Sequence, residues 1–189
     1  MIRTRSDLSY YISQDAAIND VNPGLFWYWA HLVAGSERAH AFRYLKCLRH
    51  CEYHLNNTGI LHSVLFLYYS FRKKRMGLRY GISIPDNTVG YAFRILHMFG
   101  GGFIINCRRM GNHCAVNAGV LVGNKDSQEN VPDIGDYVAL GPGVKVIGKV
   151  TIGTNVFVGA NSVVVDDIPG DSIAVGAPAR VIKGKEKRK

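Results

Sequence analysis

The stretch that decides the fold runs from Ile134 to Val165 and reads IGDYVALGPGVKVIGKVTIGTNVFVGANSVVV. Every sixth residue in it is aliphatic, and Gly follows that residue in four of six cases. A helix does not hold a period of six, and a simple strand repeats at two. The aliphatic positions are Ile134, Leu140, Val146, Ile152, Val158 and Val164, and the same register extends backward through Val122, Val116, Met110 and Ile104.

This period predicts a triangular β-solenoid. Each hexapeptide would form one flat side and turn one corner, so that three of them complete a coil. The aliphatic residue points into the prism, and the small residue beside it fits a crowded corner. A second apolar position, mostly Val, stands four places after each aliphatic residue, as in Val138 and Val144.

Charge and glycine are unevenly distributed along the 189 residues, whose formal net charge is +9. Residues 1–80 carry a net charge of +6 and 4 Gly, residues 81–178 carry −2 and 16 Gly, and residues 179–189 carry +5. This composition excludes a disordered chain, a collagen-like chain and a disulfide mini-protein. The uneven layout indicates two kinds of structure and, together with the repeat and the apolar spacing, predicts a helical N-terminal domain over residues 1–80, a β-helix domain over 81–184 and a basic tail over 185–189.

Helical spacing of apolar residues organises the first eighty residues. We expect helices from about Ser6, over Leu25–Val33, over Glu37–Leu55 and from Ile60 to Gly77. The inner face of the third helix would hold Phe42, Leu45, Leu48 and Cys51.

The N-terminal segment has no signal-peptide pattern, and no apolar window is long enough to span a membrane. The four cysteines show no paired spacing, which predicts free thiols in a reducing cytoplasm. They are Cys47, Cys51, Cys107 and Cys114.

Over about residues 80–184 the chain resembles the hexapeptide-repeat acyltransferases, which form left-handed parallel β-helices. Within them it looks most like the serine acetyltransferase branch, and closest to capsular and exopolysaccharide O-acetyltransferases. The resemblance implies acetyl-CoA as cosubstrate and no metal. It also implies a homotrimer with active sites between adjacent prisms, and two such trimers could pair through their helical domains. It rests on Ser83-Ile84-Pro85, Leu96-His97, Met110 to Gly123, and Ile134 through Ile182.

The resemblance implies that His97 is the general base, which takes a proton from an acceptor hydroxyl. Backbone N–H groups near Gly123-Asn124 and Gly141 are the candidates for stabilising the oxyanion. The polar insertion over residues 124–133 would leave the prism as a loop and cover the active site of a neighbouring subunit. Coenzyme A would run along Gly141, Pro142, Gly159, Ala160, Ala177 and Pro178, with its phosphates near Arg180 and Lys183.

Three positions depart from the pattern of enzymes that acetylate free serine. Leu96 stands where they carry Asp, Val131 stands where their loop carries His, and Ile82 stands where an Asp orients the catalytic imidazole. We therefore expect a sugar hydroxyl as acceptor. The alternatives are a serine O-acetyltransferase of cysteine biosynthesis and a trimeric scaffold that has lost its chemistry.

Several other groups leave two interpretations open. Cys47, His50, Cys51 and His54 could converge on a metal ion but fit a buried structural helix face better. The cluster Arg72 to Arg75 could be a solvated helix end or a surface for anionic lipid or acidic glycan. The basic tail is either solvated or attracts an anion, and no nucleic-acid motif accompanies the charge. We expect His113 to face outward without a catalytic role and Cys114 to lie in the core.

Overall fold

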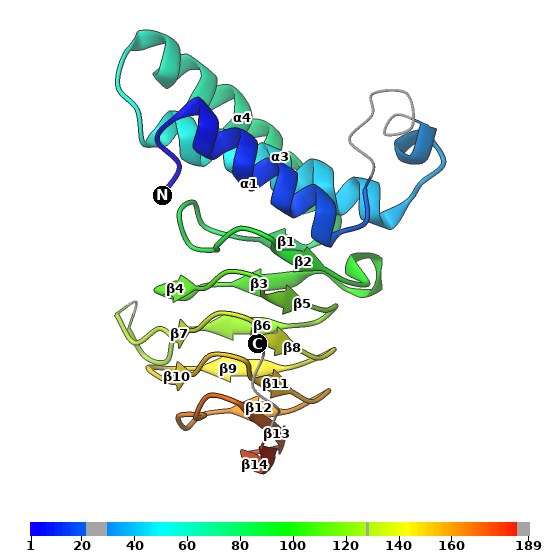
Figure 1. The fold of residues 1–189 in the computed structure, drawn as a ribbon, viewed down its shortest axis with the longest axis vertical. Coiled ribbons are helices and arrows are strands. Elements are labelled where there is room, and N and C mark those ends of the chain that lie inside the picture. Colours follow the sequence, from blue (N-terminus) through cyan, green and yellow to red (C-terminus); the bar gives the residue numbers. More distant parts are fainter. Residues whose placement is uncertain (22–29, 128, 185–189) are drawn as a thin grey trace.

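The computed structural model describes residues 1–21, 30–127 and 129–184, and it confirms a helical N-terminal part followed by a parallel β-solenoid. In Figure 1 the helices lie across the top of the prism, and the C-terminal strands lie at its bottom. The helices are α1 (Arg5–Ile18), α3 (Glu37–Leu55) and α4 (Ile60–Tyr80), so α4 extends three residues beyond its predicted end. Residues 25–29 of the helix expected over Leu25–Val33 lie outside the described residues. No helix among the described residues is long and apolar enough to span a membrane.

The described strands form three sheets, one for each face of the prism, and every coil contributes to them in turn. All pairings are parallel except that of the last two strands, which form a hairpin. The first sheet holds β1 (Ile82–Ser83), β3 (Phe103–Ile105), β6 (Leu121–Gly123), β9 (Lys145–Ile147) and β12 (Val163–Val164). The second holds β4 (Arg109–Met110), β7 (Asp133–Ile134) and β10 (Thr151–Ile152). The third holds β2 (Arg94–Ile95), β5 (Ala115–Val116), β8 (Ala139–Leu140), β11 (Phe157–Val158), β13 (Ser172–Gly176) and β14 (Ala179–Gly184).

The six-residue register correctly identifies the buried side chains from Met110 onward. All six repeat positions from Ile134 to Val164 are buried, and so are the positions four places after them as far as Ser162. The backward extension to Ile104 is wrong, because this side chain is 45% exposed while Ile105 is buried. Four residues lie between Ile105 and Met110, whereas five lie between Val146 and Ile152, the residues that occupy the same places in a later coil. This corner is one residue shorter, which moves the inward position by one.

The crowded corners explain the glycines of the repeat. A Cβ atom added at Gly141 would lie 2.9 Å from the backbone nitrogen of Ala160 in the next coil. That separation is far below van der Waals contact, so only glycine fits without displacement of the coil.

One hydrophobic core runs through both parts of the chain. The predicted inner face of α3 is buried, including Phe42, Leu45, Leu48 and Cys51. Leu45 and Leu48 belong to the same cluster of buried residues as the first solenoid strand. The helices are thus packed onto the end of the prism.

Candidate active site

His97 lies at the corner where the chain passes from the third sheet to the first, which we call the His97 corner. Eight residues lie between Ile95 and Ile104 here, whereas four lie between Val116 and Leu121, with which they pair in the next coil. The added residues form the 3-10 turn η1 (Met98–Gly100), and His97 precedes it with φ 55° and ψ 36°. The imidazole is exposed, because the widened corner takes it off the regular coil surface.

The backbone around His97 is fixed by hydrogen bonds to its neighbours. The N–H of Leu96 donates to the carbonyl of Val116 in the next coil at 2.9 Å, and the N–H of Gly100 donates to the carbonyl of His97 at 2.9 Å. No carboxylate stands at position 82, where the resemblance places an orienting Asp, and Asp86, four residues later, is already paired. Ile82 is buried in the core, and Asp86 pairs with Lys73 of α4 at 2.5 Å.

Helix α1 covers the outer edge of β2, the strand that leads into His97. The carboxylate of Asp15 accepts from the N–H of Phe93 at 3.0 Å. The side chain of Asn19 accepts from the N–H of Ile95 at 3.1 Å and donates to the carbonyl of Phe93 at 2.8 Å. The first turn of the prism has no preceding coil to pair with. These side chains therefore supply the hydrogen bonds that such a coil would make with its backbone.

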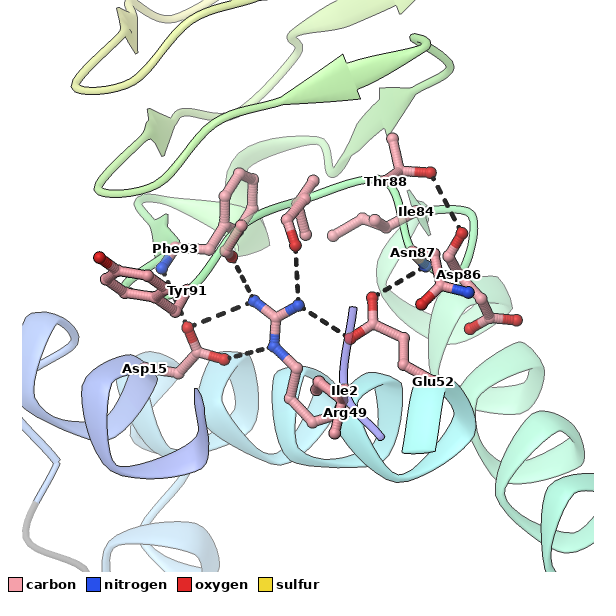
Figure 2. A network of polar contacts seen from close by, with 12 residues as sticks. Ile2, Asp15, Arg49, Glu52, Ile84, Asp86, Asn87, Thr88, Tyr91 and Phe93 are labelled. Carbon is pink, nitrogen blue, oxygen red and sulfur yellow. Dashed lines mark hydrogen bonds and ion pairs between the residues drawn. The ribbon is translucent and has the colours of Figure 1, made fainter. Parts of the chain in front are cut away.

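Arg49 of α3 completes this attachment from a fully buried position (Figure 2). Its Nε donates to Asp15 at 2.8 Å, and its Nη1 donates to Glu52 at 3.0 Å and to the carbonyl of Val89 at 2.9 Å. Burial raises the pKa of the Glu52 carboxyl, whereas the charge of Arg49 opposes that shift. Asp15, Asn19 and Arg49 could not be found from the sequence, because the partners that join them to other elements lie 34 to 78 residues away and leave no local pattern.

The polar loop lies at another corner, between the first and second sheets. Nine residues lie between Gly123 and Asp133, whereas three lie between Ile147 and Thr151, with which they pair in the next coil. In Figure 1 this yellow-green loop and the green η1 turn stand on opposite sides of the prism. Within one chain, the structure therefore does not bring Gly123 and Asn124 to His97, as their expected role in the same site would require.

Gly141 lies on the His97 corner but two coils below the histidine, which corresponds to about 10 Å along the prism. Its N–H donates to the carbonyl of Val158 at 2.9 Å. The coil-to-coil hydrogen bond thus already uses this donor, and a role of the backbone near Gly141 in stabilising the oxyanion stays a prediction.

The residues expected to bind the coenzyme do form a continuous column below His97. Gly141 and Gly159 follow adjacent strands of the third sheet, and the exposed Pro142 and Ala160 come directly after them. A Cβ atom added at Gly159 would lie 2.7 Å from Val175 of β13, so the column continues to the turn at Ala177-Pro178.

Two cations of the expected coenzyme site lie on the last strand. The exposed Arg180 pairs with Asp166 at 2.7 Å, and Lys183 lies opposite Ile173 in the terminal hairpin. The side chain of Lys183 is also exposed.

His113 and Cys114 lie at the corner between the second and third sheets. The His113 ring stacks on Tyr137, with centroids 4.8 Å apart and planes at 7°, and meets Tyr91 edge-on. The Cys114 side chain is fully buried, and burial raises the pKa of its thiol to about 12. Cys114 is thus a core residue, as predicted, because a thiol that stays protonated is a poor nucleophile.

The cysteines and histidines of α3 pack against residues of α4. The Cys47 thiol donates to the carbonyl of Tyr69 at 3.2 Å, and the His50 ring stacks on the Tyr69 ring. The Nδ1 atoms of His54 and His62 lie 3.0 Å apart. In the part of the chain that the structure describes, no three metal-ligating side chains are grouped to hold an ion.

The sequence of the repeat matches known proteins. Residues 132–166 match the model of the bacterial transferase hexapeptide family. The chain is 38% identical to a serine acetyltransferase of Staphylococcus xylosus over 111 residues, which are 57% of this chain and 51% of that protein. It is 43% identical to a serine acetyltransferase of Synechococcus elongatus over 106 residues, 54% of this chain and 43% of that protein. The chain thus spans about half the length of these relatives.

Solved structures match the fold over nearly the whole chain. The serine acetyltransferase of Neisseria gonorrhoeae has a TM-score of 0.69 at 24% identity and covers 98% of this chain and 70% of its own. A serine acetyltransferase in complex with CoA has a TM-score of 0.68 at 18% identity and covers 94% of this chain and 71% of its own. Residues 132–166 thus match the bacterial transferase hexapeptide repeat, and the chain is similar to serine acetyltransferases in the sequence of its repeat and in its fold.

Proposed function

We propose that this chain transfers an acetyl group from acetyl-CoA to a hydroxyl group, with His97 as the general base. The observation that carries the proposal is the exposed imidazole at a widened corner, directly above the column of Gly141 and Gly159. The relatives named serine acetyltransferase and the homologous complex with CoA support the reaction type.

The chemistry needs one base and no covalent enzyme intermediate. The neutral imidazole accepts the hydroxyl proton as the oxygen attacks the thioester carbonyl, and a C–O bond forms. The tetrahedral intermediate then collapses, the C–S bond breaks, and the proton passes from the imidazolium to the coenzyme A thiolate. General-base catalysis of this kind contributes roughly 10²- to 10⁴-fold to the rate.

The coenzyme would lie along the glycine column. With no side chain at Gly141 and Gly159, the pantetheine arm can approach the backbone closely. Arg180 and Lys183 would meet the phosphates. The ion pair of Arg180 with Asp166 is exposed on both sides and so is worth only about 0–1 kcal/mol, which allows a phosphate to take its place.

A homotrimer would complete the active site. What supports it is the position of the polar loop and of His97 at different corners of one prism. A three-fold arrangement can bring the loop corner of one subunit to the His97 corner of the next. A dimer of trimers through the helices would extend the same assembly.

Serine is the acceptor that the names of the relatives favour, and no comparison supports the sugar acceptor expected from the sequence. One observation keeps a sugar hydroxyl as the second candidate. Ile82 and Leu96, which stand where the serine enzymes carry carboxylates, have apolar side chains that cannot bind the ammonium group of serine.

The test is a coenzyme-A-release assay with acetyl-CoA and, in parallel, serine, simple sugars and glycan fragments. His97→Asn keeps a residue that tolerates the left-handed backbone, and we expect it to lower kcat about 10²-fold or more. His113→Asn is the matched control, since His113 also has a positive φ, of 56°, but lies at another corner. Equal rates for His97→Asn and the parent protein would show that His97 is not the base.

The outcome with different acceptors decides between the substrates. Release with serine alone identifies a serine acetyltransferase, and release with a sugar alone identifies the second candidate. A protein that binds no coenzyme A in a titration would be the degenerate scaffold instead.

A further inference from the structure

A pocket between α3 and α4 gathers four arginine side chains, and we call it the arginine pocket. Arg43 comes from α3, while Arg72, Arg75 and Arg79 come from α4. The three on α4 are three and four residues apart, so they share one face of the helix. The pocket is also lined by Phe71, Met76 and Tyr80.

The four charges lack counter-charges. Among the described residues, none of the four arginines makes an ion pair within 4.0 Å, and α4 contains no acidic residue from end to end. Like charges at this spacing destabilise a helix by about 0.2–0.5 kcal/mol per pair. The helix dipole compensates only in the last turn, where Arg79 lies. Folding therefore gives no reason to collect these cations.

The field of the cluster acts on a neighbouring histidine. Burial comes first among the causes that lower the pKa of His40, and the charges of Arg43 and Arg79 come next. The His40 Nδ1 lies 2.8 Å from the hydroxyl of Tyr80, one of the pocket residues. The charges of Arg43 and Arg79 thus act together with burial against a positive charge on His40, beside the pocket.

Two of the guanidinium groups are held in place by aromatic rings. Arg72 donates to the Tyr68 hydroxyl at 2.9 Å and lies over that ring at 5.5 Å. Arg79 lies over the Tyr80 ring at 5.7 Å. Planar guanidinium groups held before binding suit the paired hydrogen bonds that phosphate oxygens accept.

We propose that the arginine pocket binds a phosphate-bearing anion, either a soluble diphosphate or the headgroup of an anionic lipid. The pocket is separate from the proposed coenzyme column, which runs toward the opposite end of the prism. It adjoins the turn after His97, since the Tyr80 ring lies 5.9 Å from that of Phe99 in η1. A ligand there would be bound beside the active-site corner without contributing to the reaction itself.

The experiment measures binding to the full chain by calorimetry at constant ionic strength, with inorganic pyrophosphate and a nucleoside diphosphate as soluble probes. Vesicles of phosphatidylglycerol and of phosphatidylcholine probe the lipid source by co-sedimentation. The variant is Arg72→Gln with Arg79→Gln, which keeps most of each side chain. The control is Arg3→Gln with Arg5→Gln, which removes the same charge from exposed positions outside the pocket. Circular dichroism verifies that each variant folds.

We expect the pocket variant to raise the Kd of the probe that binds about tenfold or more, while the control changes it less than threefold. Binding of soluble probes identifies a soluble ligand, and binding only to phosphatidylglycerol vesicles identifies a lipid headgroup. The proposal is overturned if no probe binds or if the control loses as much affinity as the pocket variant. It is also overturned if the pocket variant raises the KM for acetyl-CoA, because the pocket would then belong to the coenzyme site. His97→Asn should bind the probes normally, so this result does not depend on the catalytic proposal.

Discussion

Single residues with a left-handed backbone mark the places where the coils turn. His113, Tyr137, Asn155 and Asp171 repeat this conformation at one corner, with φ between 53° and 60°. His97 shares it at another corner, where the 3-10 turn follows. A residue with a Cβ carries a cost of roughly 1 kcal/mol in this region, so the conformation persists because the coils on either side fix it.

Gly141 illustrates how little space the corners leave. We expect Gly141→Val to lower the free energy of unfolding by about 1–3 kcal/mol, because its Cβ would overlap the backbone of Ala160. Gly123→Ala is the control, since a Cβ there meets nothing within 4 Å. Urea denaturation of both variants checks this, and equal stability losses would contradict the packing argument.

At the scale of elements, α1 acts as the missing neighbour of β2. We expect Asn19→Ala to lower the free energy of unfolding by about 2 kcal/mol or more, because the Ile95 N–H and the Phe93 carbonyl lose their partner in a buried place. If the protein is the proposed acetyltransferase, kcat should fall as well, since β2 leads into His97, while the KM for acetyl-CoA stays unchanged.

The matched control is Asn57→Ala. The Asn57 amide donates to the carbonyls of Arg3 and Tyr53, near the surface and away from the His97 corner. The Asn57→Ala substitution should lower the free energy of unfolding by less than about 1 kcal/mol and leave kcat unchanged. A similar loss of kcat in both variants would show that the effect of Asn19 is general destabilisation.

A second prediction at this scale concerns the buried ion pairs that Arg49 of α3 makes with Asp15 and Glu52. We expect Arg49→Met to lower the free energy of unfolding by about 3–5 kcal/mol, because Asp15 and Glu52 are left without their cation in the interior. Adding Glu52→Gln should restore part of the loss, since it removes one of the uncompensated charges. Denaturant unfolding of the single and double variants tests this, and no recovery in the double variant would argue against it.

The histidines of α3 make stability depend on pH. Burial, then Lys46 and His54, lower the pKa of His50 to about 4, below the ordinary value near 6.5. Between pH 4 and pH 6.5 the unfolded chain binds more protons at position 50 than the folded chain does. The contribution of the neutral His50 to stability is therefore fully present above about pH 6.5 and is lost as the pH falls toward 4. His50→Phe keeps the stacking on Tyr69 but removes this proton site.

We therefore expect the stability loss between pH 7.5 and pH 5.0 to be about 1 kcal/mol smaller in His50→Phe than in the parent protein, after allowance for the partial exposure of His50. Urea unfolding at both pH values measures it. Because Glu52 titrates in both proteins, its contribution cancels in the difference. An identical pH dependence would show that His50 does not carry the effect.

At the scale of the whole molecule, the two halves of the proposed active site lie at different corners of the chain. Mixing His97→Asn subunits with subunits that lack residues 125–130 should therefore restore activity, although each variant alone is inactive. In randomly mixed trimers at equal ratio, about a quarter of the sites would pair an intact His97 with an intact loop. Co-expression with two affinity tags and the coenzyme-A-release assay check this. No recovery in a verified mixed trimer would contradict the shared site.

The repeat made most of the prism predictable. The inward positions from Met110 to Val164 follow from the period of six, and the six-residue insertion of the loop leaves that register intact. The register fails at Ile104, because a corner one residue shorter carries no mark in the sequence. Apolar spacing placed the described helices, and α3 has its predicted ends at Glu37 and Leu55, whereas α4 continues past Gly77 to Tyr80.

The sequence by itself determined the repeating coil, the helices before it and the position of His97, because each depends on residues close together in the chain. Only the tertiary structure decided that Gly141 has no free N–H, that Gly123 and His97 stand at different corners, and that α1 covers the edge of β2. It also decided that four arginines from two helices share one pocket. These features depend on contacts between segments that are distant in the sequence. The stacking of coils and the packing of helices on the prism make these contacts, and no local sequence pattern predicts them.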